Sequence, residues 1–226
     1  MNFYIQYLQR SEFLRTEHKN DYHFFNTEAL DSKCKQEDGN SFAKLRRWFK
    51  GVNIFEKAYI FLPIHACQHW SLAIISIPAR EYEVGPIILL HLDSLGLHTS
   101  RTIFENIRRY LKAEWEHLNQ ADVPVQVPIA EKIWKDLPRN IQEKKIQVPQ
   151  QENDYDCGLF VLFFMERFIE EAPPRLRKTN LDRFGRKWFQ PAEASRLRDS
   201  IESCLRSISK KQKKAFRILW IMVHFQ

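Results

Sequence analysis

The sequence predicts one α+β domain in which a small central sheet is flanked by helices. Three runs rich in β-forming residues follow one another at 58–63, 70–77 and 87–93, and segments with helical spacing stand before and after them. Strands grouped in this way, without regular alternation with helices, are typical of an α+β fold. A length of 226 residues with 44% hydrophobic content is sufficient for a single domain with a proper core.

The N-terminal elements are expected to be helical. Residues 2–8 form an apolar-rich opening. A second helix is expected over 42–49, where apolar residues recur at helical spacing, namely Phe42, Leu45, Trp48 and Phe49. The β-rich runs come next, separated by Pro, charged residues and Gly85-Pro86, which predicts a small sheet with a hairpin-like connection.

Helices return after the strands. Residues 102–118 are typical of an amphipathic helix whose apolar face consists of Ile103, Ile107, Tyr110, Leu111 and Trp115. A Pro-punctuated loop and a short extended segment at 146–149 then lead to a long apolar run that begins at Cys157 and indicates a buried helix. A further helix is expected over 191–205.

Cys157 is a candidate nucleophile because it stands near the N-terminus of that buried helix. Unpaired amides and the positive end of the helix dipole converge there, and both favour a thiolate over a thiol. The plainer interpretation of a lone cysteine at a helix start is a small buried hydrophobe. The residues described next favour the catalytic interpretation.

Two strands present a base and a carboxylate. His69 opens the run 70–77, and Asp93 ends the run 87–93. A carboxylate at the end of a hydrophobic strand lies at the edge of the sheet, where it can accept the Nδ1–H of an imidazole and fix its tautomer. His91 is the nearest rival base, but on an extended strand it shares the face of Asp93 and cannot readily turn back onto that carboxylate.

Gln151 is the candidate donor to an oxyanion. It stands six residues before Cys157, and its side-chain amide could donate to a developing oxyanion together with the backbone N–H of Cys157. Gln150 is the neighbour with which it could be confused.

A metal site is an alternative for part of this region. His65, Cys67 and His69 alternate and would face one way on a strand. A fourth ligand is not evident nearby, and the apolar strand explains His69 otherwise, so we predict no metal site. The four cysteines have no short paired spacing, which argues against a disulfide framework and favours a reducing compartment.

The order of these residues matches a known family. The chain resembles the ubiquitin-like-specific cysteine proteases that process and remove SUMO, and most of all the plant branch of that family. The resemblance runs from residue 2 to about residue 189, and it is carried by His69-Trp70, by Asp93-Ser94 and by the stretch from Gln151 to Gly158.

The resemblance implies an activity and a fold. It implies a fold of the papain-like cysteine protease superfamily, of the adenain-like, ubiquitin-like-protease type, over residues 1–208, followed by an atypical basic and apolar tail over 209–226. It also implies hydrolysis after the C-terminal Gly-Gly of a SUMO-like modifier, either in maturing its precursor or in releasing it from a lysine. The site residues would be Cys157, His69, Asp93 and Gln151. Neither a metal nor an organic cofactor is implied.

Two tryptophans are candidates for substrate binding. In the family, the residue after the catalytic histidine helps to form a narrow tunnel over the terminal Gly-Gly, which gives this role to Trp70; core packing is the alternative. Trp48 is expected to contact the modifier or to pack in the core. Related catalytic domains carry residues before the equivalent of Met1, including an aromatic residue on the opposite tunnel wall, so we expect a truncated N-terminus.

The formal net charge of +7 fits nucleic acid, a membrane surface or an acidic protein partner. The resemblance favours the last, because SUMO-type modifiers are acidic. It implies that the partners are a SUMO-like modifier and sumoylated proteins, without nucleic acid or a membrane, and that the protein is a monomer located in the nucleus, with a cytoplasmic share left open. The alternatives are a protease for another modifier, notably a deneddylase, and a weakly active SUMO-binding protein.

Overall fold

The computed structural model describes residues 1–10, 20–27, 30–31, 52–78, 85–119 and 140–207. The strands are β1 (Tyr22–Phe24), β2 (Leu30–Asp31), β3 (Tyr59–Ala66), β4 (His69–Ser76), β5 (Ile87–Leu92) and β6 (Ile141–Ile146). The helices are α1 (Asn2–Arg10), α3 (Ser100–Asn119), α5 (Cys157–Glu171) and α6 (Pro191–Ser207), with short 3-10 segments η2 (Ile54–Glu56) and η3 (Lys178–Phe184).

The strands form one mixed sheet in the order β1-β3-β4-β5-β6, with β2 also beside β3. Strand β4 is antiparallel to both of its neighbours, β3 and β5, whereas β1 and β2 run parallel to β3 and β6 runs parallel to β5. The parallel pairing of β5 and β6 follows from α3, which lies between them in the sequence and returns the chain to the same end of the sheet. The predicted α+β fold class is confirmed.

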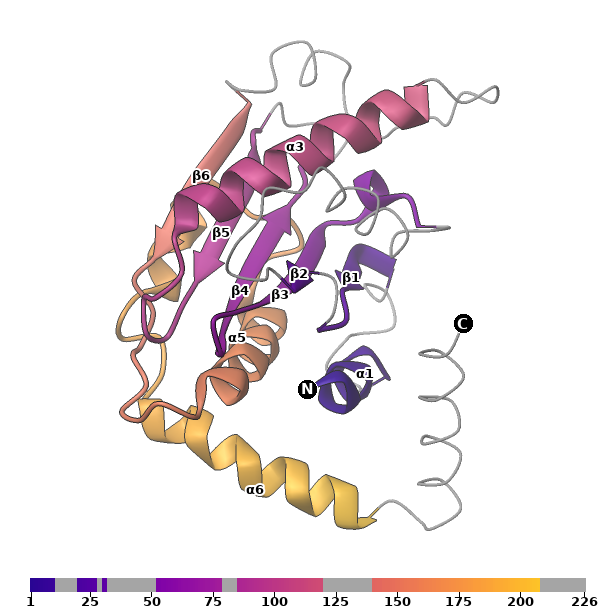
Figure 1. The fold of residues 1–226 in the computed structure, drawn as a ribbon. Coiled ribbons are helices and arrows are strands. Elements are labelled where there is room, and N and C mark those ends of the chain that lie inside the picture. The colour runs from indigo at the N-terminus through magenta and orange to yellow at the C-terminus, as the bar shows by residue number, and fades with distance from the viewer. Residues whose placement is uncertain (11–19, 28–29, 32–51, 79–84, 120–139, 208–226) are drawn as a thin grey trace.

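Side chains on the central strands alternate between the two faces of the sheet. On β4, Leu72 and Ile74 belong to the core cluster that includes α5, whereas Ala73 and Ile75 belong to the cluster that includes α3. Figure 1 shows α3 along one face and α5 on the other. Because helices cover both faces, these strands are almost continuously apolar.

Helix α5 begins at Cys157, where the sequence predicted a buried helix, and contacts β4, α1 and α6. Phe160, Phe164 and Phe168 on this helix are completely buried. Phe164 also stacks on Trp188, with ring centroids 6.0 Å apart. Truncation of such a buried Phe to Ala costs about 3–5 kcal/mol. Helix α5 is therefore fixed on several sides, and its first residue is held in a defined place.

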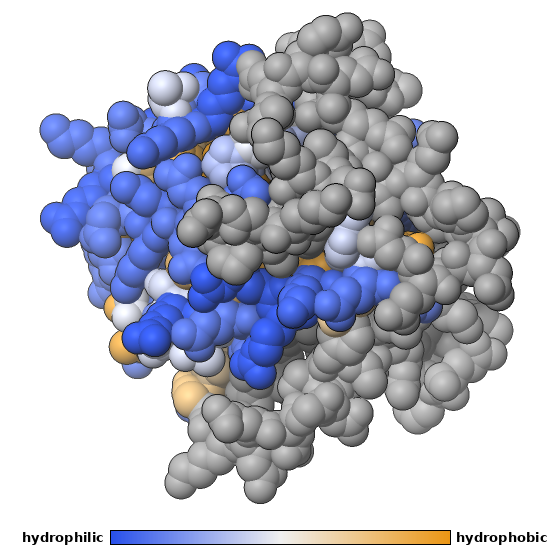
Figure 2. All heavy atoms as spheres, turned by 90° about the horizontal axis from the view of Figure 1, so that it is seen from above, coloured by the Kyte–Doolittle hydropathy of each residue, from blue (hydrophilic) through white to orange (hydrophobic). Residues whose placement is uncertain are grey.

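Helix α3 is amphipathic, as predicted. Ile107 and Leu111 are buried against the sheet, whereas Arg109 and Lys112 are exposed. Figure 2 looks down on the molecule from above and shows mostly hydrophilic side chains among the described residues of that face. Among the described helices, none combines the length and the apolar character that crossing a bilayer requires.

Several elements differ from the sequence-based expectation. The extended segment predicted at 146–149 is instead the exit from β6, which spans 141–146. Its sequence Gln142-Glu143-Lys144-Lys145 is polar because β6 ends the sheet, and residues 143–145 are exposed. The short strands β1 and β2 were not predicted. The helix predicted over 42–49, with Trp48, and the tail over 209–226 lie outside the described residues.

Candidate active site

Cys157 is the first residue of α5 and is only 5% exposed. The helix starts when the backbone N–H of Phe160 donates to the carbonyl oxygen of Asp156 at 3.0 Å. The first amides of α5 therefore point towards the Cys157 side chain, as expected for a helix N-terminus. The backbone N–H of Gly158 is one of them, and it donates to the Cys157 sulfur.

The Cys157 sulfur is also hydrogen-bonded to His69, and it accepts the backbone N–H of Trp70. Both residues lie at the start of β4, against which α5 packs. Burial by itself would raise the pKa of the Cys157 thiol, but these hydrogen bonds and the charge of His69 outweigh it and lower that pKa below its usual value. The site therefore favours a thiolate.

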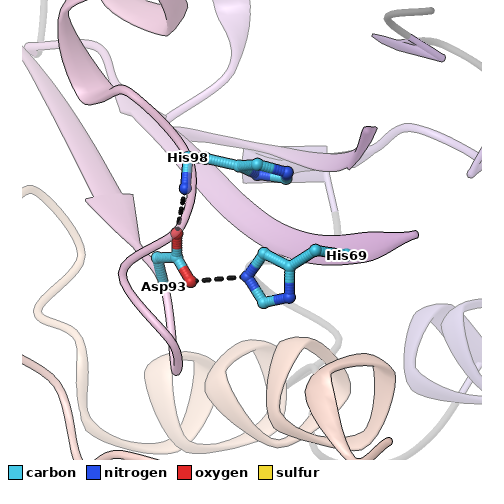
Figure 3. A group of neighbouring side chains, drawn as sticks. All are labelled: His69, Asp93 and His98. Carbon is cyan, nitrogen blue, oxygen red and sulfur yellow. Dashed lines mark hydrogen bonds and ion pairs between the residues drawn. The ribbon is translucent and has the colours of Figure 1, made fainter. Parts of the chain in front are cut away.

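His69 donates to Asp93 through Nε2, and the distance to Asp93 Oδ1 is 2.6 Å (Figure 3). The contact predicted from the sequence, through Nδ1, is wrong for this fold. Since Nε2 faces the carboxylate, Nδ1 is left for Cys157. Burial lowers the pKa of His69, but the hydrogen bonds to Asp93 and Cys157 reverse this effect and raise the pKa to about 9. The imidazole is therefore protonated at neutral pH.

Asp93 follows the last residue of β5 and is 3% exposed. Besides His69, its carboxylate accepts the backbone N–H groups of Leu95 at 3.0 Å, Gly96 at 2.9 Å and His98 at 2.9 Å. Gly96 has a φ of +69°, a conformation that glycine adopts without strain. Burial would raise the pKa of Asp93, but these hydrogen bonds hold it well below its usual range. The turn after β5 thus keeps the carboxylate ionised.

Gln151 lies in the loop before α5 and is 7% exposed. Its Oε1 accepts the hydroxyl of Ser94 at 2.6 Å, and its Nε2 donates to the carbonyl oxygen of Asn153 at 2.7 Å. Gln150, the possible source of confusion, is exposed, and its amide donates to the backbone carbonyl oxygens of Val148 and Asp93. Gln150 thus fastens the loop, whereas the Gln151 amide is buried inside it.

Asp156 is a buried charge next to the nucleophile, 3% exposed. Its carboxylate accepts hydrogen bonds from Asn153 Nδ2 at 2.9 Å, Ser195 Oγ at 2.7 Å and a guanidinium nitrogen of Arg198 at 2.6 Å. Ser195 and Arg198 belong to α6. These contacts lower the pKa of Asp156 despite the opposing effect of burial, and they connect α6 to the start of the catalytic helix.

Trp70 is partly buried and stacks on His65, with ring centroids 4.3 Å apart. The two residues are cross-strand partners on β3 and β4. A Cβ atom added at Gly158 would lie 3.8 Å from Trp70 Cδ1, so the indole edge lies over the start of α5. Its place beside Cys157 is compatible with the predicted substrate contact. Trp48 lies outside the described residues, and its role stays a prediction.

Sequence reasoning missed a chain of buried hydrogen bonds beside the triad. His91 bonds Ser100 Oγ through Nδ1 at 2.8 Å and Ser71 Oγ through Nε2 at 3.0 Å. Ser71 Oγ also bonds His98 Nδ1 at 2.7 Å, and His98 Nε2 donates to the carbonyl oxygen of Ala66 at 3.1 Å. No local sequence pattern pairs His91 with Ser71. Both ring nitrogens of His91 are therefore occupied by serine hydroxyls.

The metal site considered for His65, Cys67 and His69 is not formed. Strand β3 ends at Ala66 and β4 begins at His69, so the strand alternation is broken by a turn at Cys67-Gln68. Both turn residues have positive φ, 50° and 60°, as a two-residue hairpin turn requires. Cys67 is moreover disulfide-bonded and offers no thiolate. This bond was not predicted, because the cysteines show no short paired spacing.

A different trio, His69, Asp93 and His98, has ligand atoms within 4.8 Å of one another, a spacing that a metal ion could use. Figure 3 shows that His98 turns its backbone nitrogen, not its ring, to Asp93. Both ring nitrogens of His98 bond Ser71 and Ala66, and both carboxylate oxygens of Asp93 accept hydrogen bonds. Coordination would disrupt these contacts, so the geometry favours a catalytic triad over a metal centre.

Comparisons with known proteins find similarity in family, in sequence and in fold. The family model described as "Ulp1 protease family, C-terminal catalytic domain" matches residues 1–198. The chain is 51% identical over 212 residues to ubiquitin-like-specific protease 1D of Arabidopsis thaliana. It is 50% identical over 218 residues to ubiquitin-like-specific protease 1C of the same plant.

These alignments cover 91% and 93% of this chain but 36% and 38% of the two relatives, so the chain spans little more than a third of their length. The fold is similar to that in a crystal structure of a de-sumoylating protease, with a TM-score of 0.54 and 21% sequence identity. That superposition covers 89% of this chain and 71% of the other.

Proposed function

The chain belongs to the Ulp1 protease family, and from this premise we propose that it is a cysteine peptidase that cleaves after the C-terminal Gly-Gly of a SUMO-like modifier. One observation carries the proposal: Cys157 is hydrogen-bonded to His69, and His69 to Asp93, with the thiol pKa lowered and the imidazole pKa raised to about 9. A thiolate beside an imidazolium is the form in which a cysteine peptidase attacks a carbonyl carbon.

The reaction begins when the Cys157 thiolate forms a bond to the carbonyl carbon of the terminal glycine. The negative charge moves to the carbonyl oxygen, where the backbone N–H of Cys157 and the Gln151 amide stabilise it. The bond to the leaving amine then breaks while His69 donates its proton to that amine. A thioester remains on Cys157.

Water completes the turnover. His69, now neutral, takes a proton from the water molecule, whose oxygen attacks the thioester carbonyl carbon. The carbon–sulfur bond breaks, the modifier leaves as a carboxylic acid that loses its proton to solvent, and the thiolate and imidazolium are restored. The leaving amine of the first step is a backbone amine in a precursor and a lysine ε-amine in a conjugate, so the same residues serve both reactions.

Trp70 is the proposed substrate contact. Its indole edge lies over the start of α5, and the His65 ring stacks on the indole. A ring in that place leaves room for a chain without side chains and collides with any Cβ atom, which selects Gly-Gly sterically. A ubiquitin-like modifier is proposed from the names of the relatives, the ubiquitin-like-specific proteases 1C and 1D, and SUMO among such modifiers from the de-sumoylating protease of similar fold.

The proposal is tested with electrophilic probes built on the C-termini of SUMO, NEDD8 and ubiquitin. We expect the full chain to form a covalent adduct with the SUMO probe through Cys157, and Cys157→Ala to form none. Faster labelling by the NEDD8 probe would replace the proposal with a deneddylase. Binding of SUMO without any adduct would favour a SUMO-binding protein. Nuclear location stays a prediction, for which a fluorescent fusion is the test.

A further inference from the structure

The side chain of Gln151 is held at both ends. Ser94 donates its hydroxyl to Oε1 at 2.6 Å, and Nε2 donates to the carbonyl oxygen of Asn153 at 2.7 Å. Both Ser94 and Gln151 are buried, at 1% and 7% exposure. A carboxamide fixed at its oxygen and at its nitrogen has no freedom to rotate, so its direction is set by its neighbours.

The donors and acceptors allow one orientation of this amide. The carbonyl oxygen of Asn153 can only accept, so the Gln151 nitrogen must face it. The oxygen then faces Ser94, whose hydroxyl must donate. Among the described residues, the second N–H of Nε2 has no acceptor in the protein. This N–H is therefore available to donate a hydrogen bond to an oxyanion.

The backbone links the same two residues again. The N–H of Gln151 donates to the carbonyl oxygen of Ser94 at 3.2 Å, and Gln150 Nε2 donates to that of Asp93 at 3.3 Å. Asp93, which holds the catalytic histidine in Figure 3, directly precedes Ser94. One turn therefore fixes both the carboxylate of the triad and the loop that carries Gln151.

We propose that Ser94 is a positioning residue that fixes the Gln151 amide so that its free N–H is presented to the oxyanion. The proposal rests on the proposed function, which assigns the oxyanion contact to Gln151. Ser94 itself donates to Gln151 and does not contact the reacting atoms. Its hydroxyl acts only through the direction of the amide.

The other end of the amide is supported from α6. Asn153, whose carbonyl oxygen accepts from Gln151, donates through Nδ2 to the carboxylate of Asp156 at 2.9 Å. That carboxylate is held in turn by Ser195 and Arg198. Asn153 is therefore fixed independently of Ser94. Loss of the Ser94 hydroxyl leaves this end in place and frees only the oxygen end of the amide.

A positioning role makes a specific prediction for steady-state kinetics on a fluorogenic SUMO C-terminal substrate. Ser94→Ala leaves Oε1 buried without a donor, and we expect kcat to fall about ten-fold with KM unchanged. Gln151→Ala should lower kcat by about 10²–10³-fold, as for other oxyanion donors. The double variant should be no slower than Gln151→Ala, because Ser94 acts only through that amide.

Three controls separate this role from general stability. Ser76→Ala removes another buried serine hydroxyl, on β4 outside the site, and should leave kcat unchanged. Ser94→Thr and Ser94→Val add similar volume and differ by the hydroxyl, so Thr should be the faster of the two even if both are less stable. The pH dependence of Cys157 alkylation by iodoacetamide should be the same in Ser94→Ala and in the wild type.

Any of three results would overturn the inference: a wild-type kcat in Ser94→Ala, losses that multiply in the double variant, or equal rates for Thr and Val at position 94. A shifted alkylation profile would place the effect of Ser94 at the thiolate and would also overturn it. If the proposed function itself were wrong, the wild-type protein would cleave no modifier substrate, which distinguishes that failure from a failure of the inference about Ser94. A wild type that cleaves SUMO beside an equally fast Ser94→Ala rejects the inference alone.

Discussion

His69 and His91 lie in the same sheet, on adjacent strands, and differ in almost every chemical respect. Both are buried, at 3% and 0% exposure, and both feel the charge of Asp93. Yet the pKa of His69 is raised to about 9, whereas burial lowers the pKa of His91 to about 4. One histidine is therefore charged at neutral pH and the other is neutral.

The atoms in contact with each ring explain the difference. His69 contacts the carboxylate of Asp93 and the sulfur of Cys157, and the anionic forms of both groups stabilise an imidazolium. His91 touches the hydroxyls of Ser71 and Ser100, which adapt to a neutral ring and offer no charge. Burial alone therefore does not determine whether a histidine is protonated. The charge of the groups in contact with its ring determines it.

The largest expected effect is that of Cys157→Ser, which removes the anion on one side of His69. Turnover of a SUMO C-terminal substrate should fall at least ~10³-fold, because a serine hydroxyl does not form an equivalent nucleophile beside this imidazole. Cys204→Ser is the matched control, since Cys204 is a second cysteine outside any disulfide, on α6, and it should be near wild type. Full hydrolysis by Cys157→Ser would remove the nucleophile assignment.

Substitution of each histidine compares the two sites directly. His69→Ala should lower kcat/KM by about 10²–10⁴-fold, the usual contribution of a general acid or base. His91→Ala should change kcat/KM by less than about three-fold. It should instead lower the free energy of unfolding by about 1–3 kcal/mol, because hydroxyl groups are left buried without their partner.

Kinetics and thermal unfolding of both variants decide the assignment. A larger rate loss for His91→Ala than for His69→Ala would transfer the role of base to His91. Glu105→Gln is a suitable control substitution, because Glu105 lies on the outer side of α3, outside the site. It should change neither kcat/KM nor the free energy of unfolding.

Asp93→Asn should weaken the distinction between the two histidines. The neutral amide supplies less support for the imidazolium, and its NH₂ group meets backbone N–H donors, so we expect a rate loss of about 10²-fold. In the wild type, the rate should fall as the pH rises past about 9, where His69 loses its proton. In Asp93→Asn this alkaline limb should move to lower pH. An unmoved limb in the pH–rate profile would contradict the role of Asp93.

The last expected effect concerns stability in mild acid. The pKa of His91 is near 4 in the folded protein and near 6.5 when unfolded, so the unfolded state binds the proton first. Stability is therefore complete above pH 6.5 and declines towards pH 4, by about 1.4 kcal/mol per pH unit for this group. Denaturant unfolding of the wild type and of His91→Gln should show a shallower decline in the variant. Parallel curves would show that His91 does not titrate in this window.

The sequence was sufficient for the parts of the site that local patterns mark. Cys157 begins an apolar helix, and Asp93 ends an apolar strand. His69 begins β4, the strand that contacts both α5 and β5. Such boundaries are visible in a sequence because burial changes abruptly there. The central strands and helices α3, α5 and α6 were predicted for the same reason.

The parts that were not predicted depend on contacts between distant residues. Which ring nitrogen of His69 meets Asp93 follows from the antiparallel packing of β4 and β5 under α5, which no local pattern records. The bond from Ser94 to Gln151 joins residues 57 positions apart. The hairpin turn at Cys67 lies between the predicted strands 58–63 and 70–77, and no local pattern indicated that both strands extend to it.

Strand β6 has a consequence for how the protein behaves at high concentration. It is the last strand of the described sheet on its side, and an outer strand with free backbone groups is a template on which another chain can add. Glu143, Lys144 and Lys145 are exposed along it, and Glu143 also pairs with Arg108 of α3 at 3.2 Å. The addition of another strand would bury these charges or bring like charges together, which is unfavourable. The polar residues that kept β6 from being predicted as a strand therefore also protect the sheet from aggregation.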